Sequence, residues 1–291
     1  MAAVSGLSVP RALPHWRFWV LALGLAVLAI PTIITLGNQE WSRDSGAHGP
    51  LVLGTAAWLF WRARDEFKAV GTAGSHWLTT LGFLVSLPFY VFGRAYGFLS
   101  LEVAGLYGAF ISILHAEFGF KALLKNWFPI FYLGFLVPPP SWFMDDLTAP
   151  LKLFASWVAT DGLMVFGIPI SREGVTLVVG SYQLLVEDAC SGMNSLTGLV
   201  AISLFYIYLL RNASWRYSLF LACFVIPIAV VANIVRIVIL VLLTYFFGDA
   251  VAQGFLHQAA GLVLFTTSLI LVFAIDSLAS RLWPRPKEQV A

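Results

Sequence analysis

The sequence has few charged residues, and this shortage decides the class of protein. Charged residues make up 11% of the 291 positions and hydrophobic residues 59%, whereas a soluble domain carries about 25% charged residues. A formal net charge of +2 is too small to suggest a nucleic-acid partner. The chain also lacks internal repeats and any long polar stretch that would form a separate soluble domain. These absences indicate one integral membrane domain over residues 1–291.

Apolar runs of roughly 20 residues recur along the chain, the length that an α-helix needs to cross a hydrocarbon core. The first run follows Arg11 and Arg17, but it is too long for a signal peptide and has no cleavage site after it. We predict an all-α polytopic membrane protein of about eight transmembrane helices, with an interfacial helix and a small β-hairpin on the outer side. The expected spans are 17–37, 50–62, 77–93, 97–118, 124–140, 191–211, 215–240 and 257–283.

The distribution of basic residues sets the expected orientation. With a cytosolic N-terminus, most lysines and arginines fall on cytosolic segments, among them Arg62, Arg64, Arg211 and Arg216. The positive-inside rule therefore predicts that both termini are cytosolic.

One substantial segment, about 141–189, is then left on the outer side. It follows three prolines at 138–140, which favour a stiff, extended exit from the membrane. Residues 147–166 are moderately apolar and suit a helix lying in the interface. Residues 174–186 predict a hairpin with a two-residue turn at Gly180-Ser181, and this hairpin leads directly to Glu-Asp-Ala-Cys-Ser-Gly at 187–192.

Three residues far apart in the sequence are expected at the same depth, near the outer surface. Cys190 lies at the outer start of the sixth span, and His257 opens the eighth span at the same level. The seventh span climbs outward from Arg216, so Arg236 lies about 30 Å further along it. Cys223 lies about 20 Å below that surface, so we expect a packing role for it and no disulfide to Cys190.

These side chains favour thiol catalysis. A cysteine is nucleophilic as the thiolate, whose pKa falls beside a histidine, an arginine or a helix N-terminus. Ser191 or Asn194 would cap the helix that follows Cys190. His257 would carry the proton and return it to the leaving amine, while Arg236 would stabilise the oxyanion.

Other polar residues are expected near these three. Asn233 lies three residues before Arg236, on the same helix face, and would orient it. Glu187 and Asp188 suit solvated loop charges, but they would also serve as partners of Arg236 or contacts to substrate. His48, in the first outer loop, would line the same site. Arg236 alone would suit an interfacial anchor, although a charge among apolar residues is costly and usually functional.

The motifs Ala189-Cys190-Ser191-Gly192 and Asn233-Ile-Val-Arg236, followed by His257, resemble the exosortase and archaeosortase family. The similarity is strong over about 171–265, which we take as the catalytic half, and it extends weakly to His48-Gly49. It implies an enzyme that processes proteins bearing a C-terminal sorting signal, made of a Pro-Glu-Pro-type motif, a transmembrane helix and a basic cluster. It also implies that Cys190 is the nucleophile, His257 the acid and base, and Arg236 the stabiliser.

The resemblance further implies a short-form member in a bacterial inner membrane, with its active site on the periplasmic face. Expected partners are the substrate proteins and membrane lipid, and neither a cofactor nor a metal is expected. The acceptor stays open between water, an amine, a lipid and a polysaccharide. The alternative is a non-catalytic assembly or transport factor of an exopolysaccharide system, although a transporter would place its polar residues nearer the bilayer midplane.

Overall fold

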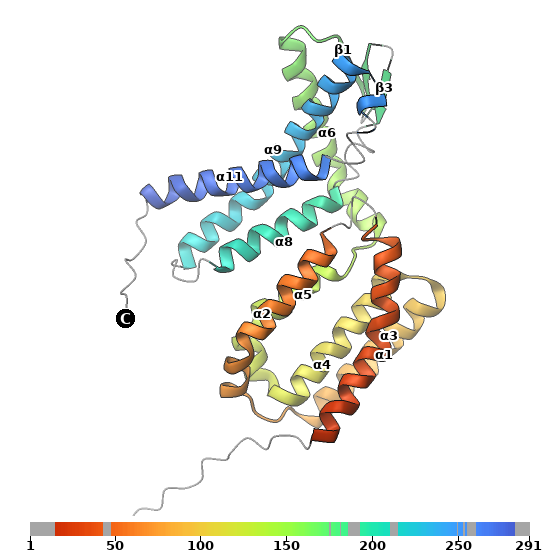
Figure 1. Ribbon diagram of the computed structural model, residues 1–291, viewed down its shortest axis with the longest axis vertical. Helices are drawn as coiled ribbons and strands as arrows, with labels where there is room; N and C mark the ends of the chain where they lie inside the picture. Colours follow the sequence, from red (N-terminus) through yellow and green to blue (C-terminus); the bar gives the residue numbers. More distant parts are fainter. Residues whose placement is uncertain are drawn as a thin grey trace, which may run out of the picture. The chain divides into compact units, whose positions relative to one another are not determined.

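The computed structural model describes residues 15–42, 48–174, 176–180, 182–185, 193–209, 215–248, 250–252, 254 and 260–282. Contacts divide the chain into two compact units (Figure 1), each of which is described by itself. The first unit comprises residues 1–40 and 50–139, and the second comprises residues 41–49 and 140–291.

The described part of the first unit is built from helices. They are α1 (His15–Gln39), α2 (Gly49–Val70), α3 (His76–Tyr96), α4 (Leu99–Lys125), α5 (Trp127–Leu133) and the short 3₁₀ helix η1 (Gly134–Leu136). Helices α1, α3 and α4 lie side by side (Figure 1). The turn from α3 to α4 passes through Gly97, whose φ of 74° lies in the left-handed region that glycine adopts without steric cost.

Small residues bring α3 and α4 unusually close together. A Cβ atom on Gly105 would lie 2.4 Å from the backbone nitrogen of Tyr90, and one on Gly93 would lie 2.3 Å from that of Glu102. Both distances are too short for any larger residue without movement of the backbone. Such close approach is typical of membrane helices, whose association depends on packing because lipid removes the hydrophobic driving force between them.

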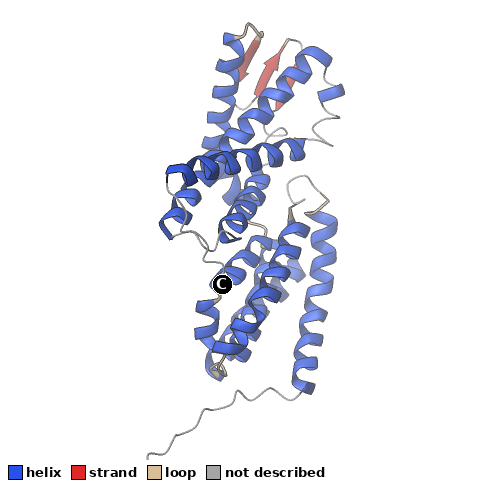
Figure 2. Ribbon diagram, turned by 60° about the vertical axis from the view of Figure 1, so that its left-hand side comes forward, coloured by secondary structure: helices blue, strands red, loops and turns tan. Residues whose placement is uncertain are grey.

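The second unit combines helices with one small sheet. Its elements are α6 (Ser141–Val165), β1 (Ile170–Glu173), β2 (Thr176–Val179), β3 (Tyr182–Leu185), α8 (Met193–Leu209), α9 (Trp215–Phe247) and α11 (Ala260–Leu282). The strands form an antiparallel sheet in the order β1-β2-β3. The sheet, red in Figure 2, packs against α6 and α9, which are labelled in Figure 1. The predicted hairpin is confirmed as β2 and β3, with Gly180 at a φ of 60° in its turn. Strand β1 adds a partner that the sequence did not predict.

Helix α9 extends beyond its predicted end at residue 240. Its 33 residues span about 50 Å, more than the roughly 30 Å of a hydrocarbon core. Near its C-terminal end, Ile237 and Val241 are fully buried in a cluster with Ala159 of α6, Leu177 of β2 and Leu184 of β3. The sheet and α6 therefore bury α9 across its predicted end, at Ile237 and Val241, and this contact favours continuation of the helix past residue 240.

Four helices within the described residues are long and apolar enough to cross a membrane. They are Trp19–Gln39, His76–Tyr96, Leu99–Lys125 and Leu219–Phe247. The membrane character is thus confirmed, whereas the predicted number of eight spans is not. The expected fifth span, 124–140, corresponds to a short apolar helix, Trp127–Leu136, which measures about 15 Å and falls short of a crossing.

The expected interfacial helix corresponds to α6, which begins at Ser141 rather than at residue 147. Pro140 precedes it in an extended conformation, with φ and ψ of −59° and 139°. One face of α6 packs against α9 and the sheet, whereas the other exposes large apolar side chains. These exposed side chains include Trp142, Phe143, Phe154 and Trp157. An exposed aromatic face of this kind suits contact with a membrane.

Candidate active site

The described part of the candidate site lies on α9. Asn233 and Arg236 are three residues apart and therefore share a face of the helix, and both are buried, with exposed fractions of 5% and 2%. Arg236 is among the largest fully buried side chains of the protein, and its neighbour Ile237 is fully buried in an apolar cluster. Enclosing a charge in an apolar helix is costly, and such residues usually act in function.

Helix α8 runs antiparallel to α9 and brings its first turn toward Arg236. Leu199 of α8 packs with Ala229 and Ala232 of α9, whereas Ile207, further along α8, packs with Tyr217 and others near the start of α9. The N-terminal end of α8 therefore lies beside the C-terminal half of α9. The beginning of α8, at Met193, is directed toward the level of Arg236 and the turns beyond it.

The sheet packs against the same stretch of α9. Its last strand, β3, precedes residues 186–192 in the sequence, whereas α8 follows them. Leu184 of β3 belongs to the buried cluster that contains Ile237, the residue next to Arg236. The two described segments that flank residues 186–192 thus both pack on α9 near Arg236. Cys190 itself, with Glu187, Asp188 and Ser191, lies outside the described residues, as does the side chain of Asn194.

The segment after α9 turns back along the helix. Ala252 is fully buried against Leu240, one helical turn beyond Arg236, and α11 begins at Ala260 and packs along α9. The described segments on either side of residue 257 therefore also lie on α9. His257 falls outside the described residues, so its predicted proximity to Arg236 stays a prediction.

The structure brings His48 to the beginning of α8. A Cβ atom on Gly198 would lie 2.7 Å from both Cβ and Cγ of His48, so the glycine leaves the space that the histidine occupies. His48 belongs to the second unit although it precedes α2 in the sequence. The structure thus joins a residue of the first predicted outer loop to the helix that follows Cys190.

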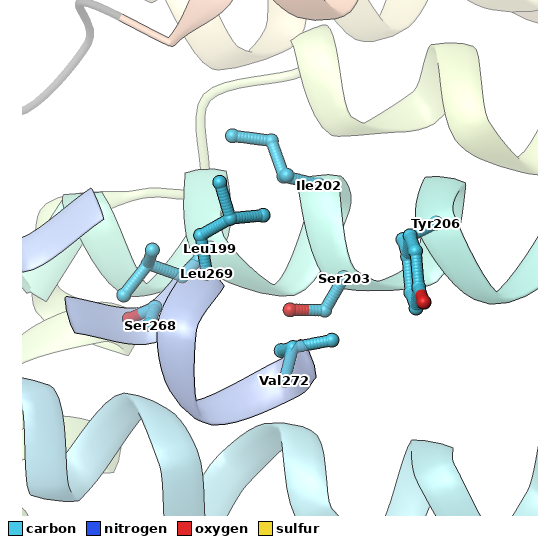
Figure 3. Close-up of a pocket in the computed structure, with 7 residues that line it drawn as sticks. All are labelled: Leu199, Ile202, Ser203, Tyr206, Ser268, Leu269 and Val272. Carbon is cyan, nitrogen blue, oxygen red and sulfur yellow. The ribbon is translucent and has the colours of Figure 1, made fainter. Parts of the chain in front are cut away.

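A small pocket lies between α8 and α11 (Figure 3). Its lining residues are Leu199, Ile202, Ser203, Tyr206, Ser268, Leu269 and Val272. The hydroxyl of Ser268 is buried and has no hydrogen-bond partner among the residues that the structure describes. The pocket measures about 10 Å³, room for about one water molecule. It is too small for a peptide.

Two polar networks, each built around a buried carboxylate, were not predicted from the sequence. Tyr206 and Tyr217 donate hydrogen bonds to Asp276 at 3.0 and 2.5 Å, which ties α8, α9 and α11 together near the start of α9. In the first unit, Arg94 forms an ion pair with Glu102 at 3.0 Å. The signal that would have found both networks is an acidic residue within an apolar helix, which is rare without a role.

The described residues hold no cluster of three or more histidine, cysteine, aspartate or glutamate side chains arranged for a metal ion. The described elements bring together the arginine on α9 and the segments that pack near it.

A protein-family model described as transmembrane exosortase matches residues 41–274, a range that includes His48, Asn233 and Arg236. No curated protein and no solved structure gives a significant match.

Proposed function

This chain belongs to the transmembrane exosortase family, and on that premise we propose that it is a membrane-embedded cysteine protease or transpeptidase. Its substrates are secreted proteins with a C-terminal sorting signal of Pro-Glu-Pro motif, transmembrane helix and basic cluster. The observation that supports this most is Arg236, a guanidinium buried in α9 at the level where the segments flanking Cys190 and His257 pack.

In the first half-reaction, the thiolate of Cys190 attacks the scissile carbonyl carbon and forms a C–S bond. The carbonyl oxygen becomes an oxyanion, which Arg236 stabilises through its fixed charge and donors. The C–N bond then breaks, His257 gives its proton to the leaving amine, and the C-terminal helix departs. The product is a thioester between Cys190 and the substrate.

In the second half-reaction, an acceptor attacks the thioester carbonyl and His257 removes its proton. The C–S bond breaks and the thiolate of Cys190 is restored. An amine acceptor gives transpeptidation, whereas water gives simple proteolysis. Supporting roles fall to Asn233, which orients Arg236, and to Ser191 or Asn194, which cap α8 so that its N-terminal dipole favours the thiolate.

The remaining site residues act on the substrate or on the position of α8. Glu187 and Asp188, which follow the hairpin, contact the substrate or the guanidinium of Arg236. His48 sets the position of the first turns of α8 through its contact at Gly198. The site lies on the periplasmic face of the inner membrane with both termini cytosolic, as the distribution of basic residues favours.

The test is to co-express a protein carrying the tripartite signal and to follow the loss of its C-terminal helix by mass. We expect Cys190→Ala to abolish processing and His257→Ala to reduce it severely, whereas Cys223→Ala processes normally. Cys223 is a suitable control because it is free and exposed on α9, well before Arg236. Normal processing by Cys190→Ala would favour the non-catalytic assembly factor instead.

A further inference from the structure

A polar pocket opens in the first unit where α1 and α3 end and α4 begins. It is lined by Thr35, Gln39, Arg94, Gly97, Leu99 and Glu102, and it measures about 330 Å³. This volume lies within the range of sites for small molecules. All of its lining residues belong to the first unit, so the pocket is separate from the residues proposed for catalysis.

An ion pair forms the wall of the pocket. The Nη1 atom of Arg94 lies 3.0 Å from Oε1 of Glu102 and donates to Thr35 at the same distance. Thr32 donates a further hydrogen bond of 2.7 Å to the same carboxylate oxygen. The Glu102 side chain is 4% exposed, whereas that of Arg94 is 43% exposed. The buried carboxylate therefore holds the guanidinium in place and leaves part of it open.

The open part of Arg94 is suited to an anion. A guanidinium has five N–H donors on three nitrogens, and the hydrogen bonds of Arg94 to described residues use Nη1 alone. Nη2 and Nε remain as a planar fork, the geometry that binds two oxygens of one phosphate. The 27-residue helix α4 begins beside it at Leu99 without a side-chain cap, and its first N–H groups add a partial positive charge.

Aromatic residues at the same turn indicate the depth of the pocket. Phe92, Tyr96 and Phe98 are all exposed, and the ring of Phe92 lies 4.5 Å from that of Tyr96 and 6.1 Å from that of Phe98. An exposed tyrosine such as Tyr96 at the end of a spanning helix marks the level of the lipid headgroups, because its ring is apolar and its hydroxyl polar. Both α3 and α4 are long and apolar enough to span a membrane, so their connecting turn lies at that level.

We propose that this pocket binds a phosphate ester that carries a hydroxyl or amine group beside the phosphate. Arg94 holds the phosphate, and the oxygens of Gln39 and Glu102 receive the hydroxyl or amine. A glycerophospholipid headgroup has this chemistry, and so does a soluble ester such as glycerol phosphate. The proposal is independent of Cys190 and of catalysis.

The experiment measures the thermal unfolding midpoint of the purified full-length protein in detergent. One titration adds phosphatidylglycerol in mixed micelles, another adds glycerol phosphate, and a third adds a lipid of matched chain length without phosphate. Two variants test the pocket. Arg94→Lys keeps the charge beside Glu102 but loses the fork, and Leu99→Trp narrows the pocket while keeping both charged residues. Arg172→Lys, at an exposed position of β1 in the second unit, is the matched control.

We expect the wild type and Arg172→Lys to be stabilised by the phosphate-bearing ligand and not by the phosphate-free lipid. Both pocket variants should bind it about tenfold more weakly or worse, the size expected for a lost hydrogen bond to a charged group. Stabilisation by phosphatidylglycerol alone identifies a lipid site, and equal stabilisation by glycerol phosphate identifies a soluble ester. Equal binding by the wild type and both pocket variants, or equal stabilisation by the phosphate-free lipid, would overturn the proposal.

Discussion

Each unit of the molecule holds an arginine within a candidate membrane span, and the two arginines differ in how far they are exposed. Arg94 lies in the last turn of α3, is partly exposed and is fixed by the buried carboxylate of Glu102. Arg236 lies well inside α9 and is 2% exposed. The first arrangement keeps a charge at the edge of a helix pair, where it is partly hydrated. The second encloses a charge almost completely, which is costly enough to require a role at that place.

The comparison is tested most strongly by Arg236→Lys. This change keeps the charge but removes the planar fork of donors, and the loss of one oxyanion donor typically lowers the rate by about 10²–10³-fold. We expect processing of a signal-bearing substrate to fall by that factor while the protein still folds. Rates from purified enzyme and near-ultraviolet circular dichroism would measure both. Arg172→Lys on β1 should keep the wild-type rate, and an unchanged rate for Arg236→Lys would exclude the stabilising role.

In the first unit, removing either partner of the ion pair between Arg94 and Glu102 should lower the stability, but by different amounts. Arg94→Ala leaves a buried carboxylate without its cation, whereas Glu102→Ala leaves an arginine that is already 43% exposed to solvent. We expect Arg94→Ala to cost up to about 3 kcal/mol, the low end for a buried pair because one partner is hydrated. Glu102→Ala should cost clearly less. Denaturant unfolding in micelles measures both, and equal losses would show that the carboxylate is not the desolvated partner.

Local patterns in the sequence predicted some elements well and others not at all. The β2–β3 hairpin was predictable because alternating residues surround a glycine turn, and α9 was predictable from its long apolar run. Strand β1 was not, since only Ile170 of its four residues is buried and no alternation is visible. The end of α9 was also missed, because the helix continues past residue 240 where Val241 packs against α6 and the sheet. Such contacts leave no periodic signal in the helix itself.

The candidate site was partly predictable for a similar reason. Arg236 attracts notice because it interrupts an apolar run, and Asn233 follows from helical spacing. The contact between His48 and Gly198 joins residues 150 positions apart, so no local pattern reports it beyond the family-like His48-Gly49. The pair of Arg94 and Glu102 was overlooked because the two residues lie on different helices, and each looks isolated within its own apolar run.

The tight crossing of α3 and α4 offers a smaller effect in the first unit. Gly105→Ala would bring its methyl group to 2.4 Å from the backbone of Tyr90, so the helices must separate. Overpacking of this kind costs about 1–3 kcal/mol. Gly54→Ala in α2 is the matched control, because a methyl group there meets nothing within 4 Å. Gly105→Ala should have the lower thermal unfolding midpoint. Equal midpoints for the two variants would show that α3 and α4 separate without a loss of stability.

The corresponding change in the second unit is Gly198→Ala, which tests whether His48 belongs to the working site. The new methyl group would lie 2.7 Å from the Cβ and Cγ atoms at the base of the His48 side chain, so the backbone of His48 must shift as well, and a turn outside the helices shifts more easily than the backbone of a helix. We therefore expect a loss of stability of only about 1 kcal/mol, the low end of overpacking. Gly162→Ala in α6, where nothing lies within 4 Å, is the control in the same unit.

The decisive comparison is then between stability and rate in these two variants. If His48 sets the position of the first turns of α8, Gly198→Ala should lower the processing rate severalfold more than its small loss of stability explains, while Gly162→Ala leaves the rate unchanged. His48→Gly combined with Gly198→Ala should restore the packing of α8 but not the rate, because both clashing atoms of His48, Cβ and Cγ, are removed and the histidine is still missing. A double variant with the wild-type rate would show that His48 only fills space beside α8.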